Sequence, residues 1–227
     1  MLILAIDTAL GAVAACVYDT ETDQVLASER LILARGHAEA LVPLLERLAA
    51  HFSGGFDAIE RVAVTTGPGS FTGIRVGVAA ARAIGVARDI EVVGVTTFSA
   101  FAAPLLGRGR ADVACVVDAR HGNVFIETFD HTGAVVHQAV VVPVRQAAVR
   151  LGDTHTILTG PGAPLVAIEA WSLGRKADVG GETVSPPIDF VARLGALADR
   201  QESPANPFYL KATDVTYNAS TLTLARL

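Results

Sequence analysis

Apolar and polar residues alternate along the chain in segments that predict strands and helices in a regular order. Short apolar segments bounded by Gly, Asp and Thr predict β-strands, and apolar residues three or four positions apart predict helices. In the first half these patterns predict strands at 2–6, 12–18, 24–32, 61–66 and 91–95, and helices at 38–51, 70–88 and 97–106. The order of elements in this half is therefore βββαβαβα.

The second half repeats this order more loosely. Its patterns predict strands near 112–118, 123–129, 134–142, 155–159 and 176–179, and helices near 143–151, 163–171 and 188–201. We therefore predict a duplicated α/β fold with an N-terminal lobe at 1–107, a reduced C-terminal lobe at 108–202 and a tail at 203–227. The pattern leaves open whether residues 212–227 form a strand or are disordered.

Local sequence supports the duplication. Asp7-Thr8-Ala9-Leu10-Gly11-Ala12-Val13 is echoed by Asp118-Ala119-Arg120-His121-Gly122-Asn123-Val124, and Thr66-Gly67-Pro68-Gly69 by Thr159-Gly160-Pro161-Gly162. Both echoes fall at the same place in the predicted order. Two βββαβαβα lobes are the architecture of the actin-like (ASKHA) fold of Hsp70 and sugar kinases. In that fold, two Asp-containing turns face each other across a cleft and hold metal-bound nucleotide phosphates, an analogy that does not by itself establish function.

A glycine-rich stretch, Gly67–Gly77, joins a predicted strand to a predicted helix. It is not a Walker loop, because no Lys follows any glycine, and the spacing of its glycines is too long for a dinucleotide fingerprint. It also lacks the Gly-x-Ser-x-Gly elbow of a serine nucleophile. We interpret Ser70 as a helix N-cap. The small residues that follow predict close packing of another backbone against one helical face; they are Gly73, Gly77, Ala80, Ala81 and Ile84.

Composition limits the classes of protein to which the chain can belong. The chain has 227 residues, of which 51% are hydrophobic, and a formal net charge of −5, which argues against disorder and against a self-sufficient nucleic-acid binder. No apolar run is long enough to span a membrane, and the amino-terminal residues lack the features of a signal peptide. Cys16 and Cys115 lie in apolar strand patterns, so we expect buried thiols in a reducing compartment.

Several motifs, in order along the chain, resemble the bacterial TsaB (YeaZ) family. They are Ile3-Leu4-Ala5-Ile6-Asp7-Thr8, His37-Ala38-Glu39-Ala40-Leu41-Val42-Pro43, Gly67–Gly77, Asp118-Ala119-Arg120 and Pro207-Phe208-Tyr209-Leu210-Lys211. The string Gly-Pro-Gly-Ser-Phe-Thr-Gly-Ile-Arg is the most specific of them. Ala9 stands where the family often has Ser, and Lys211 where Arg is usual, which puts any role of those two side chains in doubt.

The resemblance implies a cytoplasmic, non-catalytic subunit in the synthesis of N6-threonylcarbamoyladenosine next to the tRNA anticodon. Such a subunit docks TsaD, a catalytic sister of the same fold, together with the ATPase TsaE, forms a homodimer when alone, and meets tRNA only through the complex. The sister family carries a metal-binding His-x-x-x-His, whereas here His37 is followed at that spacing by Leu41. No pair of the six histidines has that spacing, so we predict no metal site.

The two Asp-containing turns offer candidates for a nucleotide site: Asp7, Thr8, Gly11, Asp118, Arg120 and Gly122. Arg120 and His121 are bulky where nucleotide-binding relatives tend to use small residues. We therefore favour a degenerate site with no bound cofactor and interpret Arg120 as part of a structural ion pair. Weak or interface-shared binding of ATP or ADP stays open.

The resemblance places the partner interface on the first two long helices, which would pair with those of a partner as a four-helix bundle. The candidate residues are His37, Glu39, Leu41, Leu44, Leu45, Leu48, Ser70, Phe71, Thr72, Gly73, Arg75, Val76, Gly77, Ala80 and Ile84. The leucine stripe has an alternative interpretation as core.

Two other functions stay open from the sequence. Asp7 and Asp118 leave room for an ATP-dependent kinase or hydrolase that acts alone. A stand-alone tRNA binder would need a local basic patch, for which the candidates are Arg145, Arg150, Arg175 and Lys176. The acidic net charge disfavours this last function.

Overall fold

The computed structural model describes residues 1–181 and 184–210, so Lys211 and the predicted strand or disordered segment at 212–227 lie outside the described part. Its contacts divide the chain into two units, Met1–Ala100 with Val184–Phe208 and Phe101–Thr183 with Tyr209–Leu227. This division differs from the predicted lobes, because the chain returns to the first unit after residue 183.

The first unit is built on a five-stranded sheet in the order β3-β2-β1-β4-β5. Its strands are β1 (Leu2–Asp7), β2 (Ala12–Asp19), β3 (Gln24–Ile32), β4 (Arg61–Gly67) and β5 (Glu91–Thr96). The strands β1, β4 and β5 are parallel, and β2 and β3 continue the sheet in antiparallel pairs. Because Ile6 pairs with Val64, the carboxyl ends of β1 and β4 bring Asp7 beside Thr65.

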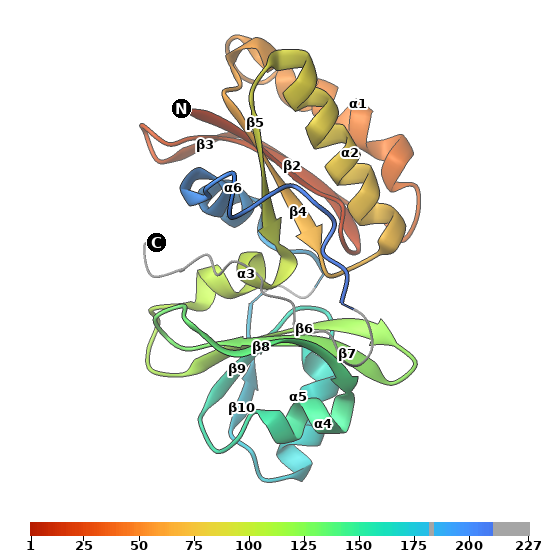
Figure 1. Ribbon diagram of the computed structural model, residues 1–227, viewed down its shortest axis with the longest axis vertical. Helices are drawn as coiled ribbons and strands as arrows, with labels where there is room; N and C mark the ends of the chain where they lie inside the picture. Colours follow the sequence, from red (N-terminus) through yellow and green to blue (C-terminus); the bar gives the residue numbers. More distant parts are fainter. Residues whose placement is uncertain (182–183, 211–227) are drawn as a thin grey trace. The chain divides into compact units, whose positions relative to one another are not determined.

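Helices cover both faces of this sheet (Figure 1). The helices α1 (His37–Ala49) and α2 (Phe71–Arg88) lie side by side on one face, and α6 (Ile188–Leu197) lies on the other. The predicted assignment of the last helix to the second lobe is corrected by its packing, since α6 contacts β1, β2, β4 and β5. Helix α6 also ends at Leu197 rather than 201, because Ala198 is extended and Asp199 accepts hydrogen bonds from the next backbone amides.

The second unit repeats the same architecture in smaller form. Its sheet has the order β10-β9-β6-β7-β8, formed by β6 (Asp112–Arg120), β7 (Asn123–Phe129), β8 (Val135–Pro143), β9 (Thr156–Thr159) and β10 (Ala177–Val179). Helices α4 (Val144–Arg150) and α5 (Ala163–Ser172) correspond to α1 and α2 and are shorter by several residues. Along the chain, α3 (Thr97–Ala102) and a 3₁₀ turn follow β5 and precede β6. The predicted duplicated α/β fold with a reduced second lobe is confirmed.

The apolar residues predicted for the strands form a separate core in each unit. Cys16 and Cys115 are both buried and free, and burial raises the pKa of each thiol, in agreement with the sequence prediction of buried thiols. Among the described residues, no helix is both long and apolar enough to cross a membrane.

Candidate functional site

The turn between β1 and β2 carries the first candidate acid, Asp7, whose side chain is fully buried. Its Oδ1 accepts hydrogen bonds from Thr65 Oγ1 at 2.6 Å and from the backbone amide of Ala9 at 3.1 Å. Its Oδ2 is buried and has no hydrogen-bond partner within the described part of the chain. Thr65 is therefore the closest partner of Asp7, a contact that only the register of β1 and β4 could have indicated.

Burial raises the pKa of Asp7 from 3.8 to about 6, because removal from water disfavours the charged carboxylate. The hydrogen bonds from Thr65 and Ala9 and the nearby His37 and Arg30 lower this pKa, but by less than burial raises it. Folding therefore raises the affinity of this carboxyl for its proton. The stabilisation from the bound proton is present below about pH 4 and is lost as the pH rises through about 6.

Asp7→Asn should remove this pH dependence. Between pH 4 and pH 7, the free energy of unfolding of the variant should improve relative to wild type by about 2–3 kcal/mol, from a pKa difference of about two units. Any pH-independent cost of burying the amide cancels in this comparison. The titration of Glu127, whose pKa is raised by burial to about 7, is the same in both proteins and cancels as well. Urea unfolding across the pH range measures the difference, and a constant gap between the two proteins would contradict the assignment.

Backbone donors that a phosphate would need are already used at this turn. The Ser70 amide at the start of α2 donates to the Ala9 carbonyl at 2.7 Å, and Ser70 Oγ accepts from the Gly73 amide at 3.3 Å, which confirms Ser70 as the N-cap. A Cβ at Gly69 would overlap the Ala9 carbonyl, so the glycine turn packs directly on the β1–β2 turn. No group of three metal-ligating side chains occurs among the described residues. The Ser70 amide and the glycine turn at the start of α2 are therefore occupied by the β1–β2 turn of the same unit.

The corresponding turn of the second unit joins β6 to β7. Arg120, His121 and Gly122 have φ values of 68°, 53° and 76°, and Asp118 Oδ1 accepts a hydrogen bond from the Arg120 amide at 2.8 Å. The Arg120 guanidinium lies 3.6 Å from Asp118 Oδ2, but it is 83% exposed, so this ion pair contributes little to stability. That the two turns face each other stays a prediction.

The small-residue face of α2 packs on the β1–β2 turn of its own unit, which corrects the assignment of Gly73 and Gly77 to a partner interface. Thr8 is buried between these two glycines, and its Oγ1 donates to the Gly73 carbonyl at 2.7 Å. A Cβ at Gly73 would overlap the Thr8 carbonyl, and one at Gly77 would overlap Thr8 Oγ1. The glycines therefore form a notch for Thr8.

The leucines assigned to the interface are also buried in the first unit. Leu41, Leu44, Leu45 and Leu48 are at most 5% exposed and belong to the core between α1 and the sheet. Val76, Ala80 and Ile84 are partly buried against the same core. The four leucines are not accessible to a partner, so the interpretation of the leucine stripe as core is correct, whereas Val76, Ala80 and Ile84 stay partly exposed.

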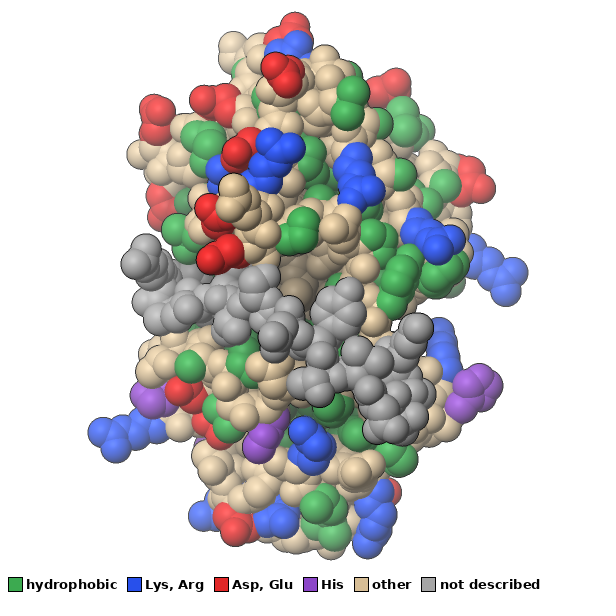
Figure 2. Space-filling view, viewed as in Figure 1, with side chains coloured by type: hydrophobic (Ala, Val, Ile, Leu, Met, Phe, Trp, Pro, Cys, Tyr) green, Lys and Arg blue, Asp and Glu red, His purple; other side chains and the backbone are tan. Residues whose placement is uncertain are grey.

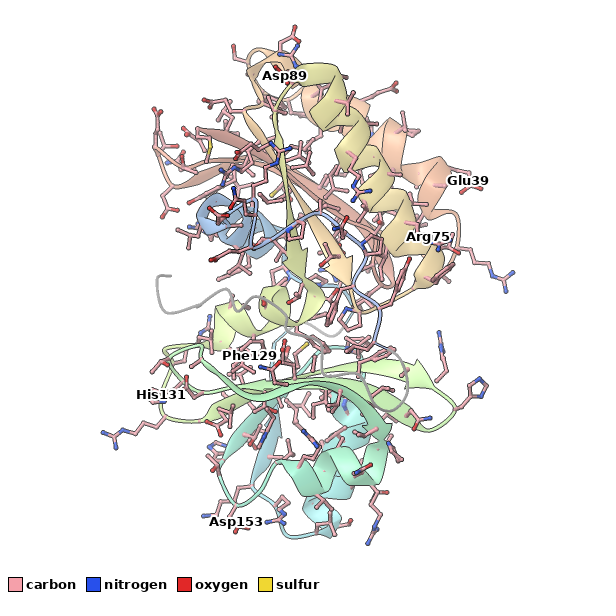
Figure 3. The ribbon with its side chains drawn as sticks, in the orientation of Figure 1. Glu39, Arg75, Asp89, Phe129, His131 and Asp153 are labelled. Atoms are coloured by element: carbon pink, nitrogen blue, oxygen red, sulfur yellow. The ribbon has the colours of Figure 1, made fainter. Side chains whose placement is uncertain are left out.

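An exposed surface remains on the opposite side of the two helices, and we call it the α1–α2 outer face. It includes the predicted residues Glu39, Phe71, Thr72 and Arg75, and two residues that the sequence analysis missed, Val42 and Val86. Figure 3 shows Glu39 and Arg75 extending from α1 and α2 away from the sheet.

Large apolar side chains on this face are strongly exposed. Val42 is 57%, Phe71 55% and Val86 85% exposed, and the Arg75 guanidinium lies 3.7 Å from the Phe71 ring centroid. Figure 2 shows apolar side chains next to Lys or Arg side chains along this side of the first unit. Val42 and Val86 could have been found as apolar residues outside the buried stripe of each helix. Exposed apolar groups gathered with cationic ones are typical of a protein-binding surface.

A sequence model for the family described as TsaD, tRNA N6-adenosine threonylcarbamoyltransferase, matches residues 30–171, more than half of the chain. The chain belongs to this family. Within it the chain is a TsaB (YeaZ) member, since it aligns with the tRNA threonylcarbamoyladenosine biosynthesis protein TsaB of Escherichia coli at 29% identity, over 55% of this chain and 53% of that protein. The Bacillus subtilis TsaB is 27% identical over 62% of this chain and 60% of its own length.

An uncharacterized Mycobacterium tuberculosis protein is 37% identical over 54% of this chain and 56% of that protein. The chain thus spans about half the length of the curated relatives it matches. Among solved structures, YeaZ from Pseudomonas aeruginosa superposes with a TM-score of 0.73 at 22% identity, covering 92% of this chain and 99% of that chain. This likeness confirms the actin-like fold.

Proposed function

We propose that this TsaB-family chain is a non-catalytic scaffold for synthesis of N6-threonylcarbamoyladenosine in tRNA, and that it docks a TsaD-like catalytic subunit through the α1–α2 outer face. The observation that carries the proposal is the exposure of Val42, Phe71 and Val86 on two adjacent helices. These side chains are 55–85% exposed in the chain alone, and their burial on docking would supply a hydrophobic driving force. Membership of the family supports the choice of pathway.

The same face would serve two partners in turn. A sister subunit of the same fold presents an equivalent helix pair, so we propose a homodimer in its absence and exchange to the heterodimer in its presence. A TsaE-like ATPase joins the assembly, and tRNA binds through the complex, in keeping with the net charge of −5. The complex would work in the cytoplasm.

An independent kinase or hydrolase is disfavoured by the β1–β2 turn. Asp7 is fully buried, and the amide at the start of α2 that would meet a phosphate is bonded to Ala9. A nucleotide site that a partner completes at the Arg120 turn is compatible with this proposal, because the Arg120 side chain is 83% exposed.

Reconstitution with each component omitted tests the proposal. Modification of tRNA should require this chain, the TsaD-like subunit and the TsaE-like ATPase together, and the chain alone should hydrolyse ATP no faster than buffer. With an activated, radiolabelled threonylcarbamoyl donor supplied, label incorporated into tRNA and released phosphate are the two readouts. Full modification without this chain, or ATP turnover by this chain alone, would refute the scaffold assignment.

A further inference from the structure

Three consecutive residues of the β1–β2 turn are bonded to the first turns of both helices that form the α1–α2 outer face. Thr8 Oγ1 donates to the Gly73 carbonyl of α2, and the Ala9 carbonyl accepts from the Ser70 amide. The Leu10 carbonyl lies 2.8 Å from His37 Nε2 at the start of α1. Because a carbonyl only accepts, this imidazole nitrogen carries the proton. One short turn thus holds both helix starts.

The contact between the β1–β2 turn and α2 fixes the position of that helix along its axis. Thr8 is 1% exposed and fills the notch between Gly73 and Gly77, one helical turn apart. Gly69 lies against the Ala9 carbonyl so closely that no side chain could fit between them. Such close packing of backbone on backbone has one arrangement rather than a range of them. The position of the first turn of α2 is therefore determined by Thr8 and Ala9.

The first turns of the two helices also carry much of the outer face. Phe71 and Arg75 lie on α2 within two residues of Gly73, and Val42 lies on α1 five residues after His37. A shift of either helix start would move these side chains relative to one another. Hydrophobic contacts across an interface need close complementarity, so such a shift would weaken docking without changing any residue of the face.

We propose that Thr8 and Leu10 position the helices α1 and α2 for partner docking, with Thr8 as the main positioning residue. This inference rests on the proposed docking function. In nucleotide-binding relatives of the fold, the β1–β2 turn holds phosphate. In this chain, we assign the same turn a different role, which is to fix the geometry of a protein-binding surface. Thr8 itself is buried in the first unit, so its role would be to position the helices rather than to touch the partner.

The test compares two buried threonines of the first unit. Thr8→Val removes the hydroxyl bonded to the Gly73 carbonyl, and Thr66→Val removes a hydroxyl bonded to the Val95 carbonyl at 3.2 Å, away from α1 and α2. Both should lower the Tm by similar amounts. Only Thr8→Val should weaken binding to the TsaD-like subunit, by about tenfold, the effect expected for one misplaced buried hydrogen bond. Thr8→Ser, which keeps the hydroxyl, should restore the affinity.

Titration calorimetry well below the Tm measures the affinities, and circular dichroism checks the fold. If Thr8→Val does not fold, His37→Ala, at a half-buried position, removes the bond between α1 and Leu10 and should weaken binding in the same direction. Equal affinities for the Thr8 and Thr66 variants would overturn the positioning role. The proposed function fails separately, if Val42→Asp with Phe71→Asp leaves the affinity of the chain unchanged.

Discussion

Gly77→Leu is expected to unfold the first unit, at a cost of more than about 3 kcal/mol, the upper end for overpacking a core. A Cβ at this position would overlap Thr8 Oγ1 and would lie 3.4 Å from Val64 Cγ2. Thr8 and Val64 are themselves buried, so neither can move toward solvent. The higher helix propensity of leucine offsets only about 1 kcal/mol of this cost.

Ala83→Leu is the matched control, because Ala83 lies on the exposed side of the same helix. It adds the same side chain and should change stability by no more than about 0.5 kcal/mol. Thermal and urea unfolding of both variants give the comparison. A folded Gly77→Leu variant with wild-type stability and weaker partner binding would show that Gly77 contacts the partner. It would contradict the packing of Gly77 against Thr8.

Val42→Asp combined with Phe71→Asp should abolish docking while leaving the fold intact. The two side chains are more than half exposed, so their replacement leaves the core unchanged. An acidic residue at position 71, the first of α2, also suits the positive end of the helix dipole. In a docked complex, two unpaired carboxylates would be buried, and we expect at least about a hundredfold loss of affinity for the TsaD-like subunit.

Asp153→Asn with Glu21→Gln gives a control that changes charge elsewhere on exposed positions. Its affinity should match that of wild type. Sedimentation velocity with the TsaD-like subunit should show a heterodimer for wild type and the control, and separate subunits for the Val42 and Phe71 variant. A heterodimer of unchanged affinity in all three proteins would exclude the α1–α2 outer face.

The sequence predicted the order of strands and helices well, because strand and helix periods are local properties of the chain. The echoes of residues 7–13 at 118–124 and of 66–69 at 159–162 indicated the duplication, and both units contain five strands in the predicted order along the chain. The packing partner of each helix was harder to predict. Helix α6 follows the second unit in sequence and yet packs on the first, held by hydrogen bonds from Arg61 to carbonyls at its end.

The candidate interface shows the limit of a helical pattern most clearly. The period of Leu41, Leu44, Leu45 and Leu48 indicates an apolar face, but it does not distinguish a core from a partner. Gly73 and Gly77 likewise predict a close neighbour without identifying it, and that neighbour is Thr8 in the β1–β2 turn. The exposed Val42 and Val86 lie outside the buried stripes of their helices, and their accessibility in the folded unit places them on the surface.

Hydroxyl-radical footprinting tests the docking surface most directly, because it reports the accessibility of individual side chains. The chain should be compared at a concentration where it is monomeric and in complex with the TsaD-like subunit. We predict strong protection of Val42, Phe71 and Val86 in the complex, and unchanged oxidation of Leu165, Ile168 and Trp171, the exposed apolar residues of α5. Protection of the α5 residues with continued oxidation of Val42 and Phe71 would contradict docking through the α1–α2 outer face.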